Sequence, residues 1–467
     1  MSSVDLIQPR HNYANPPEVE KYGHIYLPTS LHTAGARLAH AGVDVRVQDE
    51  NLRPLEINSS NVGVNLLGAP YIPEVIKLQK RIQATTRDDL QFILGGQVMN
   101  GISRAQQAQL FGPKSVNGNH DTELAQVFGL SPNALPKPES TSLIPVYEQI
   151  SDEDMQEYLS REFSLYVSQG CKFACDFCAA VRTFREPATG QITRAKEVYR
   201  DLEILEKDLG YLIQRAIGLG LNKLDIYMSN LDVFQSPDQL LDFARVCKGL
   251  KQQYPNFQLN LRGLATVDSF LRAKDTKRES IEELAEAGFH TVGFGVDGMT
   301  PQVWKAVKKG HNTEEKCIEA IRSAREDFGL SPELLMVFGH YGVDTAESLQ
   351  AAYAFTQDMV ELYRAVPRPH VSKSFIPGNE GWLRPENADA VKLLIENPEA
   401  FQSLDFTALP STLTHPDSEI RELAAKYYLK ICSIPGNTTQ HVKPITPDMS
   451  QQEIGEVKRY NVGRYDR

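Results

Sequence analysis

The chain has 467 residues, of which 41% are hydrophobic and 23% are charged, and its formal net charge at pH 7 is −11. This length is too great for one ordinary core, so we expect two or three domains. The acidic balance argues against a nucleic-acid backbone as the main partner, and the lack of an apolar run of about 18 residues argues against a membrane partner. Residues 1–5 lack the basic segment and apolar core of a signal peptide, and we therefore expect a cytoplasmic protein.

The first 130 residues alternate between strand patterns and helix patterns. Strands are expected at 4–8, 43–48, 61–67 and 90–94, and helices at 30–41 and 73–83. This alternation predicts a doubly wound parallel sheet, whose ligands lie beyond the carboxyl ends of the strands. Gly68, Gly95 and Gly96 fall at those ends, where the lack of a side chain lets a bulky ligand approach the backbone.

A proline-rich stretch, residues 131–160, interrupts the pattern and predicts an extended connector. Beyond it, strands are expected at 162–168, 223–228, 258–262, 291–296, 334–338 and 370–375. Helix starts between them are marked by Ser236, Ser280, Thr313 and Thr345. Six strands with intervening helices predict a partial (β/α)6 barrel, whose active site lies at the carboxyl ends of its strands.

Three cysteines follow the first strand of this barrel with the spacing C-x-x-x-C-x-x-C, namely Cys171, Cys175 and Cys178. Three thiolates on one short loop can hold three corners of a cubane iron–sulfur cluster, which normally takes four cysteines. The fourth iron is then open to a small molecule. The remaining cysteines, Cys247, Cys317 and Cys432, stand singly, so we expect no auxiliary cluster.

The alternatives for these three cysteines are weaker. Buried cysteines can pack as small apolar residues. A structural zinc site needs four ligands, usually including a second cysteine or histidine pair, and the sequence has no second pair. A disulfide framework is unusual in a long, cysteine-poor chain without a signal peptide. An iron–sulfur cluster is therefore the preferred interpretation.

The cysteine spacing, with the aromatic residue Phe177 before the last cysteine, resembles the radical S-adenosylmethionine (SAM) superfamily over residues 162 to about 376. The resemblance implies that SAM is chelated by the open iron of a 4Fe–4S cluster and cleaved reductively to a 5′-deoxyadenosyl radical. It also implies that Phe177 meets the adenine. Ser229 and Asn230 stand where the family usually has a Gly-Gly-Glu-like stretch for the amino group of SAM.

The same resemblance extends to three further strands of the barrel. Arg262, at the expected end of the third strand, matches a position that often contacts the carboxylate or ribose of SAM, with a surface salt bridge as the alternative. Gly293, Gly295 and Asp297 resemble the glycine-containing strand that binds adenine, with aspartate where glutamate is commoner. The next strand and its loop also match, at 338–342.

Residues 28–49 and the pair Gly95–Gly96 are similar to the cobalamin-binding domain of the cobalamin-dependent radical SAM subfamily, the class B methyltransferases. The subfamily places this domain directly before the barrel, as here, and mostly methylates unactivated carbon or phosphorus. Many cobalamin proteins ligate cobalt through Asp-x-His-x-x-Gly. Here serine replaces the aspartate in Ser30 to Gly35, so we expect that neither His32 nor another histidine ligates the cobalt.

The sequence therefore predicts an α/β protein with a Rossmann-like, cobalamin-binding-type domain (1–135), a linker (136–160), a partial radical SAM barrel (161–376) and a mixed C-terminal cap (377–467). We expect a methyltransferase that uses a 4Fe–4S cluster, SAM and cobalamin on a small molecule or peptide, with flavodoxin or ferredoxin as electron donor. Tyr227, Asp232 and Tyr341 are the expected substrate-side residues, although each could equally pack the barrel. The alternatives are a radical cyclase, rearrangement or other group-transfer enzyme without methylcobalamin, and a non-enzymatic iron–sulfur sensor.

Overall fold

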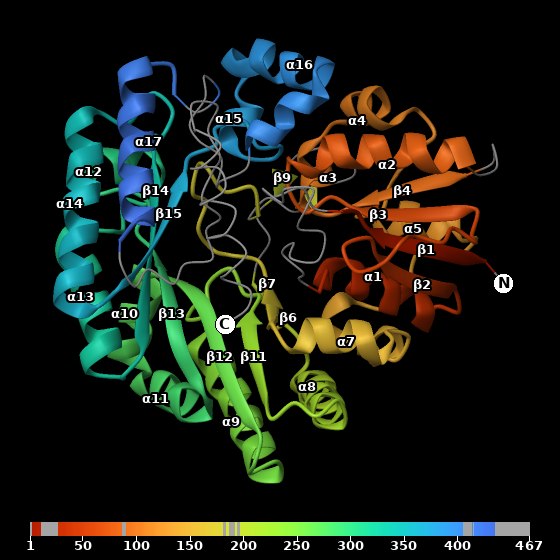
Figure 1. The fold of residues 1–467 in the computed structure, drawn as a ribbon, viewed down its shortest axis with the longest axis horizontal. Helices are drawn as coiled ribbons and strands as arrows, with labels where there is room; N and C mark the ends of the chain where they lie inside the picture. The colour runs from red at the N-terminus through yellow and green to blue at the C-terminus, as the bar shows by residue number, and fades with distance from the viewer. Residues whose placement is uncertain are drawn as a thin grey trace, which may run out of the picture.

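The computed structural model describes residues 2–10, 27–85, 90–180, 184–185, 192–193, 197–404, 413 and 415–434. Within these residues the strands form a five-stranded sheet, a six-stranded sheet and two short two-stranded pairings. Figure 1 shows the two large sheets side by side, the first in red and orange and the second in green and blue. In the same residues we find no helix with the length and apolar character that a membrane span requires.

The first sheet is parallel and has the strand order β2-β1-β3-β4-β5. Its strands are β1 (Ser3–Gln8), β2 (Asp44–Asp49), β3 (Asn61–Asn65), β4 (Gln91–Gly95) and β5 (Val116–Asn117). Its helices are α1 (Thr29–His40), α2 (Tyr71–Thr85), α3 (Gln97–Gly101), α4 (Arg104–Phe111) and α5 (Asp121–Val127). The doubly wound sheet is confirmed. Its order reverses between β1 and β3, and the carboxyl ends beside such a switch point form the ligand crevice of these folds.

The connector between the two sheets differs from the expected extended chain. It contains the 3-10 helix η1 (Pro138–Ser140) and the helices α6 (Ile144–Tyr147) and α7 (Asp152–Leu159). Prolines stand in the first turn of η1 and α6, where their missing N–H costs no helical hydrogen bond. Leu143, Tyr147 and Met155 are completely buried in the core that the connector shares with the barrel.

The second sheet is parallel, with the order β6-β11-β12-β13-β14-β15. Its strands are β6 (Glu162–Leu165), β11 (Lys223–Met228), β12 (Gln258–Thr266), β13 (Phe289–Gly295), β14 (Ser331–Phe338) and β15 (Val366–Val371). The helices are α8 (Leu202–Gly218), α9 (Pro237–Gln253), α10 (Val267–Thr276), α11 (Arg278–Ala287), α12 (Pro301–Ala306), α13 (Glu314–Glu326) and α14 (Ala346–Tyr363). The short pairings join β7 (Ser168–Gln169) to β10 (Val198–Tyr199) and β8 (Phe184–Arg185) to β9 (Ile192–Thr193). The partial barrel is confirmed.

Some strand and helix limits differ from those expected. β6 stops three residues early, β12 continues to Thr266, and β15 begins at Val366 instead of 370. Prolines at 367 and 369 hid the start of β15, because proline is tolerated in a strand chiefly at the edge of a sheet. Thr313 and Thr345 cap α13 and α14 as expected, whereas Ser280 lies inside α11.

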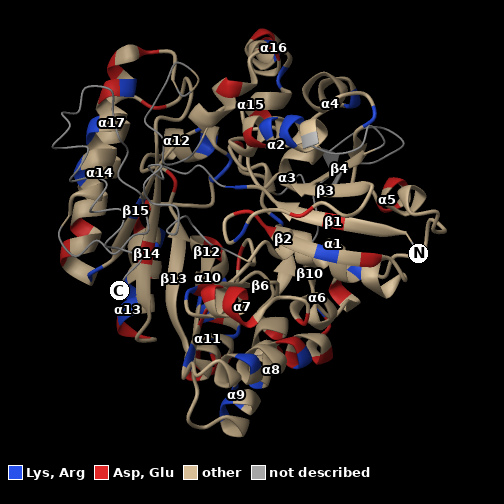
Figure 2. Cartoon of the chain, turned by 45° about the vertical axis from the view of Figure 1, so that its right-hand side comes forward, with Lys and Arg blue, Asp and Glu red and all other residues tan. Residues whose placement is uncertain are grey.

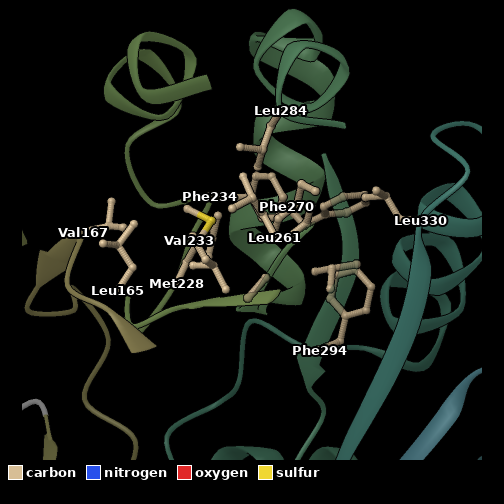
Figure 3. Packing of buried hydrophobic residues seen from close by; sticks show 14 of the residues in the cluster. Leu165, Val167, Met228, Val233, Phe234, Leu261, Phe270, Leu284, Phe294 and Leu330 are labelled. Carbon is tan, nitrogen blue, oxygen red and sulfur yellow. The ribbon is translucent and has the colours of Figure 1, made fainter. Parts of the chain in front are cut away.

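Aromatic side chains fill the space between the barrel sheet and its helices. Figure 3 shows Phe234, Phe270 and Phe294 side by side beneath Leu284. Phe270 makes edge-to-face contacts with Phe234 and Phe294 at centroid distances of 5.2 and 5.1 Å, a favoured geometry for aromatic pairs. Cys247 and Cys317 lie completely buried in the same core, on α9 and α13, as their helical positions indicated.

The C-terminal residues divide between the two sheets, which the expectation of one cap did not foresee. They form α15 (Glu380–Leu383), η3 (Pro385–Asn387), α16 (Ala388–Glu396), η4 (Pro398–Leu404) and α17 (Ser418–Cys432). Trp382, Leu394 and Phe401 join the hydrophobic core of the first sheet, while α17 packs along β15 and α14 of the barrel. Figure 2 shows Lys and Arg mixed with Asp and Glu on the outer helices of both parts.

Candidate active site

The cysteine loop begins directly after β7, at the carboxyl end of the barrel sheet. Gly170 has a φ of +95° there, a conformation that glycine adopts without strain. Cys171 and Cys175 are 6% and 7% exposed, and Cys178 is partly buried. Burial raises the pKa of Cys171 to about 12 and that of Cys175 to about 11. Thiolates at these positions therefore need a positive partner such as a metal.

A structural zinc centre would need four ligands around one ion. Among the residues that the structure describes, no group of three or more His, Cys, Asp or Glu side chains is placed to hold one metal ion. Zinc requires its ligands around a single ion. The cysteines of a cubane cluster each bind a different iron, so their sulfurs do not converge on one point.

Two distant parts of the chain hold the cysteine loop in place. The backbone N–H of Asp176 donates to the carbonyl of Val307, after α12, at 3.1 Å. The carbonyl of Asp176 accepts from the N–H of Glu380 at 3.1 Å, and its side chain pairs with Arg384 at 2.7 Å. The barrel and the C-terminal segment therefore both fix the position of the cysteines.

Phe177 lies against the carboxyl ends of β13 and β14. Its ring centroid is 5.6 Å from that of His340, which is buried in the loop after β14. His340 in turn contacts the carbonyl of Asp297 through Nε2 at 2.9 Å. Phe177 therefore lies beside the strands that the family resemblance assigns to adenine.

Asp297 itself faces the protein and not an open site. It has a φ of +53°, and its carboxylate pairs with the buried Lys309. A Cβ at Gly295 would lie 2.8 Å from Nζ of Lys309, and one at Gly293 would lie 2.7 Å from Leu264. Gly293, Gly295 and Asp297 therefore pack against neighbouring side chains, and their expected contact with the cofactor stays a prediction.

Ser229 and Asn230 lie directly beyond β11. Ser229 donates through both its N–H and its hydroxyl to the carbonyl of Leu165, at 2.9 Å each. Asn230 is 1% exposed, and its Nδ2 donates to Oγ of Ser168 at 2.6 Å. Its Oδ1 is buried and accepts no hydrogen bond. An unpartnered buried acceptor is costly, and it marks a place where a ligand can donate.

Ser168 and Glu197 complete this group, which we call the mouth relay: Asn230, Ser168 and Glu197. The hydroxyl of Ser168 donates to one carboxylate oxygen of Glu197 at 3.1 Å. Ser236 donates to the other oxygen at 2.6 Å and therefore does not cap its own helix, α9. The sequence interpretation missed Ser168 and Glu197, since no motif distinguishes either of them.

Asp232 does not reach the substrate side. It is completely buried, and its carboxylate accepts hydrogen bonds from the hydroxyls of Thr266 and Ser269 at the start of α10. Burial raises its pKa, while these hydrogen bonds lower it. These contacts favour the packing alternative for Asp232, because its oxygens already stabilise the junction of β12 and α10.

Arg262 makes salt bridges, the alternative to a contact with SAM. It lies in the middle of β12, and its guanidinium pairs with Glu162 and with Glu333, the latter at 2.8 Å. Arg368 pairs with Glu333 at 2.7 Å, so two arginines match two glutamates in what we call the interior network. Tyr227 joins it from β11, its ring 4.9 Å from the Arg262 guanidinium. These contacts make Arg262 and Tyr227 parts of the barrel interior.

Tyr341 is the expected substrate-side residue that lies at the surface. It follows β14 and is 39% exposed. Its ring packs edge-to-face on Phe375 at a centroid distance of 5.4 Å and lies 6.4 Å from that of His415. Phe375 follows β15, so the phenol stands at the rim of the barrel mouth.

The glycines of the first sheet separate into two kinds. A Cβ at Gly96, where φ is +100°, would lie 2.5 Å from the carbonyl oxygen of Leu66, so the backbone itself requires glycine. At Gly95 the nearest atom to a Cβ would be Oδ1 of Asn119, at 3.5 Å. Packing therefore leaves Gly95 unexplained. Gly68 is likewise partly exposed, beyond the end of β3.

Amide side chains surround this carboxyl edge. Asn119, which the sequence interpretation missed, donates to the carbonyl of Gly96 and accepts from its N–H, at 2.8 and 2.9 Å. Nδ2 of Asn65, at the end of β3, donates to Oε1 of Gln8 at 2.9 Å, and its Oδ1 accepts from Ser30 at 3.3 Å. The edge thus offers neutral polar groups beside the switch point.

His32 points away from this edge. It is 1% exposed, Nδ1 lies 3.1 Å from the carbonyl of Pro28, and its ring lies 6.0 Å from that of Tyr147. Burial lowers its pKa to about 4. His32 is therefore a core residue of α1, and the expectation that it binds no cobalt stays a prediction. His11 and His24 lie outside the described residues.

The two sheets meet within one residue of the cysteines. A Cβ placed on Gly378, in the segment after β15, would lie 3.4 Å from Cα of Gly101, at the end of α3. It would lie 3.7 Å from Cβ of Ala179, the neighbour of Cys178. Near the start of α1, the hydroxyl of Thr29 donates to the carbonyl of Ser164 at 3.2 Å. The ligand edge of the first sheet therefore lies next to the barrel mouth.

Comparison with known proteins agrees with this architecture. Residues 165–350 match the model of the Radical SAM superfamily. Comparison with the curated proteins found no match. Among solved structures, the radical S-adenosylmethionine methyltransferase TsrM from Kitasatospora setae, with tryptophan substrate and the SAM analogue aza-SAM bound, is similar at a TM-score of 0.66 and 16% identity. The match covers 100% of this chain and 98% of that one.

Two further structures share the fold. TsrM with cobalamin and a [4Fe-4S] cluster bound gives a TM-score of 0.63 at 15% identity, with 100% of both chains covered. The cobalamin-dependent S-adenosylmethionine radical enzyme OxsB, with aqua-cobalamin bound, gives 0.55 at 15% identity, over 90% of this chain and 58% of that one. At these identities the likeness establishes the arrangement of the two sheets.

Proposed function

We propose that this chain, which carries a radical SAM domain in the fold of the cobalamin-dependent radical SAM enzymes, is a methyltransferase that acts on carbon in a small molecule or peptide. The observation that carries the proposal is the contact at Gly378. It brings the cysteine loop and the ligand edge of the first sheet together, so that a cluster in one and a corrin in the other would share one reaction space.

The barrel mouth fits a cluster and SAM. Cys171, Cys175 and Cys178 would each hold one iron, leaving the fourth iron for the amino and carboxylate groups of SAM. The buried Oδ1 of Asn230, which lacks a donor, would accept from the amino group, and Phe177 would lie along the adenine. When bound, the reduced cluster would supply one electron to the sulfonium of SAM, delivered in the cell by a flavodoxin or ferredoxin.

The first sheet fits a corrin at its switch point. The uncovered backbone at Gly95 and Gly68 would let the macrocycle approach. The amides of Asn65 and Asn119 would fix the shape of this crevice, since they already bond Gln8, Ser30 and Gly96. No histidine of the described residues is placed as a lower ligand in this proposal, because His32 is turned into the core. Bound cobalamin would supply the transferred methyl group.

Tyr341 would form a wall of the substrate space. Its ring is fixed by Phe375, while its exposed phenol stands at the rim. TsrM has been solved with tryptophan bound as its substrate. An aromatic wall such as Tyr341 suits a flat organic substrate of that size. We therefore propose a small molecule ahead of a peptide.

The test is anaerobic purification with reconstitution, followed by an absorption spectrum and an assay with methyl-labelled SAM. We expect a 4Fe–4S cluster, a bound corrinoid, and label in a methylated product when candidate small aromatic acids are supplied. SAM cleavage without corrinoid retention would replace this proposal with a cobalamin-free cyclase or rearrangement enzyme. A cluster that never cleaves SAM would instead favour an iron–sulfur sensor.

A further inference from the structure

We propose that Glu197 is a positioning residue: through Ser168 it holds the amide of Asn230 with its oxygen toward the amino group of SAM. This inference rests on the proposed function, since it concerns how the SAM site is oriented. The three residues come from separate parts of the chain: Glu197 directly precedes β10, Ser168 lies on β7, and Asn230 lies in the loop after β11. Only the fold brings them together.

The direction of the relay follows from what each group can donate. An ionised carboxylate accepts and never donates, and a serine hydroxyl has one proton. Glu197 takes that proton at 3.1 Å, so the oxygen of Ser168 is left with lone pairs for Asn230. The NH2 group of Asn230 therefore turns to Ser168, at 2.6 Å, and Oδ1 must face the other way.

The opposite orientation is excluded while Glu197 is charged. If Oδ1 of Asn230 faced Ser168, it would compete with Glu197 for the single hydroxyl proton. One of the two acceptors would then face lone pairs without a hydrogen bond, and leaving a buried polar group unpaired is costly. The charged Glu197 thus fixes the orientation of the Asn230 amide, with Oδ1 as a hydrogen-bond acceptor at the barrel mouth.

Other groups around Glu197 are consistent with this role. Ser236 on α9 donates to its second oxygen at 2.6 Å and fixes the carboxylate plane. The hydrogen bonds from Ser236 and Ser168 lower the pKa of Glu197, Asp232 raises it and Lys172 lowers it. Tyr199, two residues away, stays neutral because burial raises its own pKa. Burial is the largest influence and raises the pKa of Glu197 to about 7.

The test is SAM affinity of the full chain with its cluster reconstituted, measured by equilibrium dialysis and by the change that SAM causes in the electron paramagnetic resonance spectrum of the reduced cluster. Ser168→Ala and Glu197→Leu should each weaken SAM binding about tenfold, the value of roughly one hydrogen bond. Ser236→Ala is the matched control at alkaline pH, where Glu197 stays charged in the parent and in the variant. It removes a hydrogen bond to Glu197 outside the relay, and there it should change affinity less than about twofold. Iron content verifies that each variant folds.

A reversed relay gives the sharpest discrimination. Asn230→Asp alone places two carboxylates against one hydroxyl proton and should weaken SAM binding as much as Ser168→Ala. In the double variant with Glu197→Gln, the new amide donates to the hydroxyl oxygen of Ser168. Ser168 can then donate to the carboxylate at position 230, whose other oxygen still faces the site. The double variant should therefore bind SAM more tightly than Asn230→Asp. If it binds no better, or if Ser168→Ala and Glu197→Leu bind like the parent, the relay is overturned.

The pH profile adds an independent readout. Protonated Glu197 donates a hydrogen bond to Ser168, and the hydroxyl of Ser168 then donates to Oδ1 of Asn230. The NH2 group of Asn230 therefore faces SAM. The affinity of the parent relative to Glu197→Gln should therefore fall as the pH drops through about 7; parallel profiles would contradict the relay. A parent protein that holds its cluster and binds no SAM would overturn the proposed function. A parent that binds SAM, with relay variants that bind it equally well, would overturn only the relay.

Discussion

The interior network and the mouth relay are two polar groups in one barrel, and their positions along the strands separate their roles. Arg262 stands four residues before the carboxyl end of β12 and is held between Glu162 and Glu333. Asn230 stands beyond the end of β11 and keeps an acceptor without a partner. Charge alone therefore does not separate the two groups. In the proposed function, position at the strand end and the unfilled hydrogen bond of Asn230 do.

The largest expected effect is at the cysteine loop. Cys175→Ala should remove the cluster and all SAM cleavage, because two cysteines cannot hold a cubane stably. Cys247→Ala is the matched control, since Cys247 is equally buried but lies in the apolar core on α9. It should keep full iron content while it loses stability through a small cavity. Iron analysis of both variants is the measurement, and normal iron in Cys175→Ala would exclude the cluster assignment.

The next effect is on the interior network. Glu333→Ala would leave the guanidiniums of Arg262 and Arg368 without a shared carboxylate, and breaking such a buried pair costs about 3–5 kcal/mol. We expect this loss in the free energy of unfolding measured with urea, with unchanged iron in the folded fraction. Glu282→Ala breaks the exposed pair with Arg278 and should cost less than about 1 kcal/mol. Equal losses in the two variants would show that the interior network has no special weight.

Substitutions at Gly95 and Gly96 distinguish a glycine that the backbone requires from one that a ligand would require. Gly96→Ala should lower stability by about 1–3 kcal/mol, because its φ is +100° and the new Cβ would meet the carbonyl of Leu66. Gly95→Ala should leave stability unchanged, since the nearest atom would be 3.5 Å away, and should reduce corrinoid retention. Thermal melting and the corrinoid absorption of purified protein measure the two effects. Full corrinoid in Gly95→Ala would remove that glycine from the proposed crevice.

At neutral pH the smallest expected effect is that of His32, which appears only as a pH dependence in acid. Burial lowers its pKa from 6.5 to about 4. Between these pH values His32 is protonated in the unfolded chain and neutral in the folded chain. The stabilisation is complete above pH 6.5 and is lost as the pH falls from there toward 4, at no more than about 1.4 kcal/mol per pH unit. Urea unfolding between these limits should show a shallower pH dependence for His32→Gln than for the parent. Identical slopes would mean that His32 does not titrate on unfolding.

Much of the fold followed from local patterns. The strand and helix alternation gave both sheets in their correct chain order, and Thr313 and Thr345 marked helix starts because a threonine oxygen there accepts from the backbone three residues on. The cysteine loop was found by spacing alone. The connector was the exception, because its prolines suggested extended chain where they begin short helices.

The sequence by itself determined the cysteine loop, the alternation and the caps at Thr313 and Thr345, since each depends on residues within a few positions of one another. Only the tertiary structure decided that Asp297 pairs with Lys309 and that Asp232 serves the start of α10. It also decided that Ser168 and Glu197 stand behind Asn230. The physical reason is that a polar side chain is defined by the partner it meets, and these partners are set by strand register and burial between segments far apart in the chain.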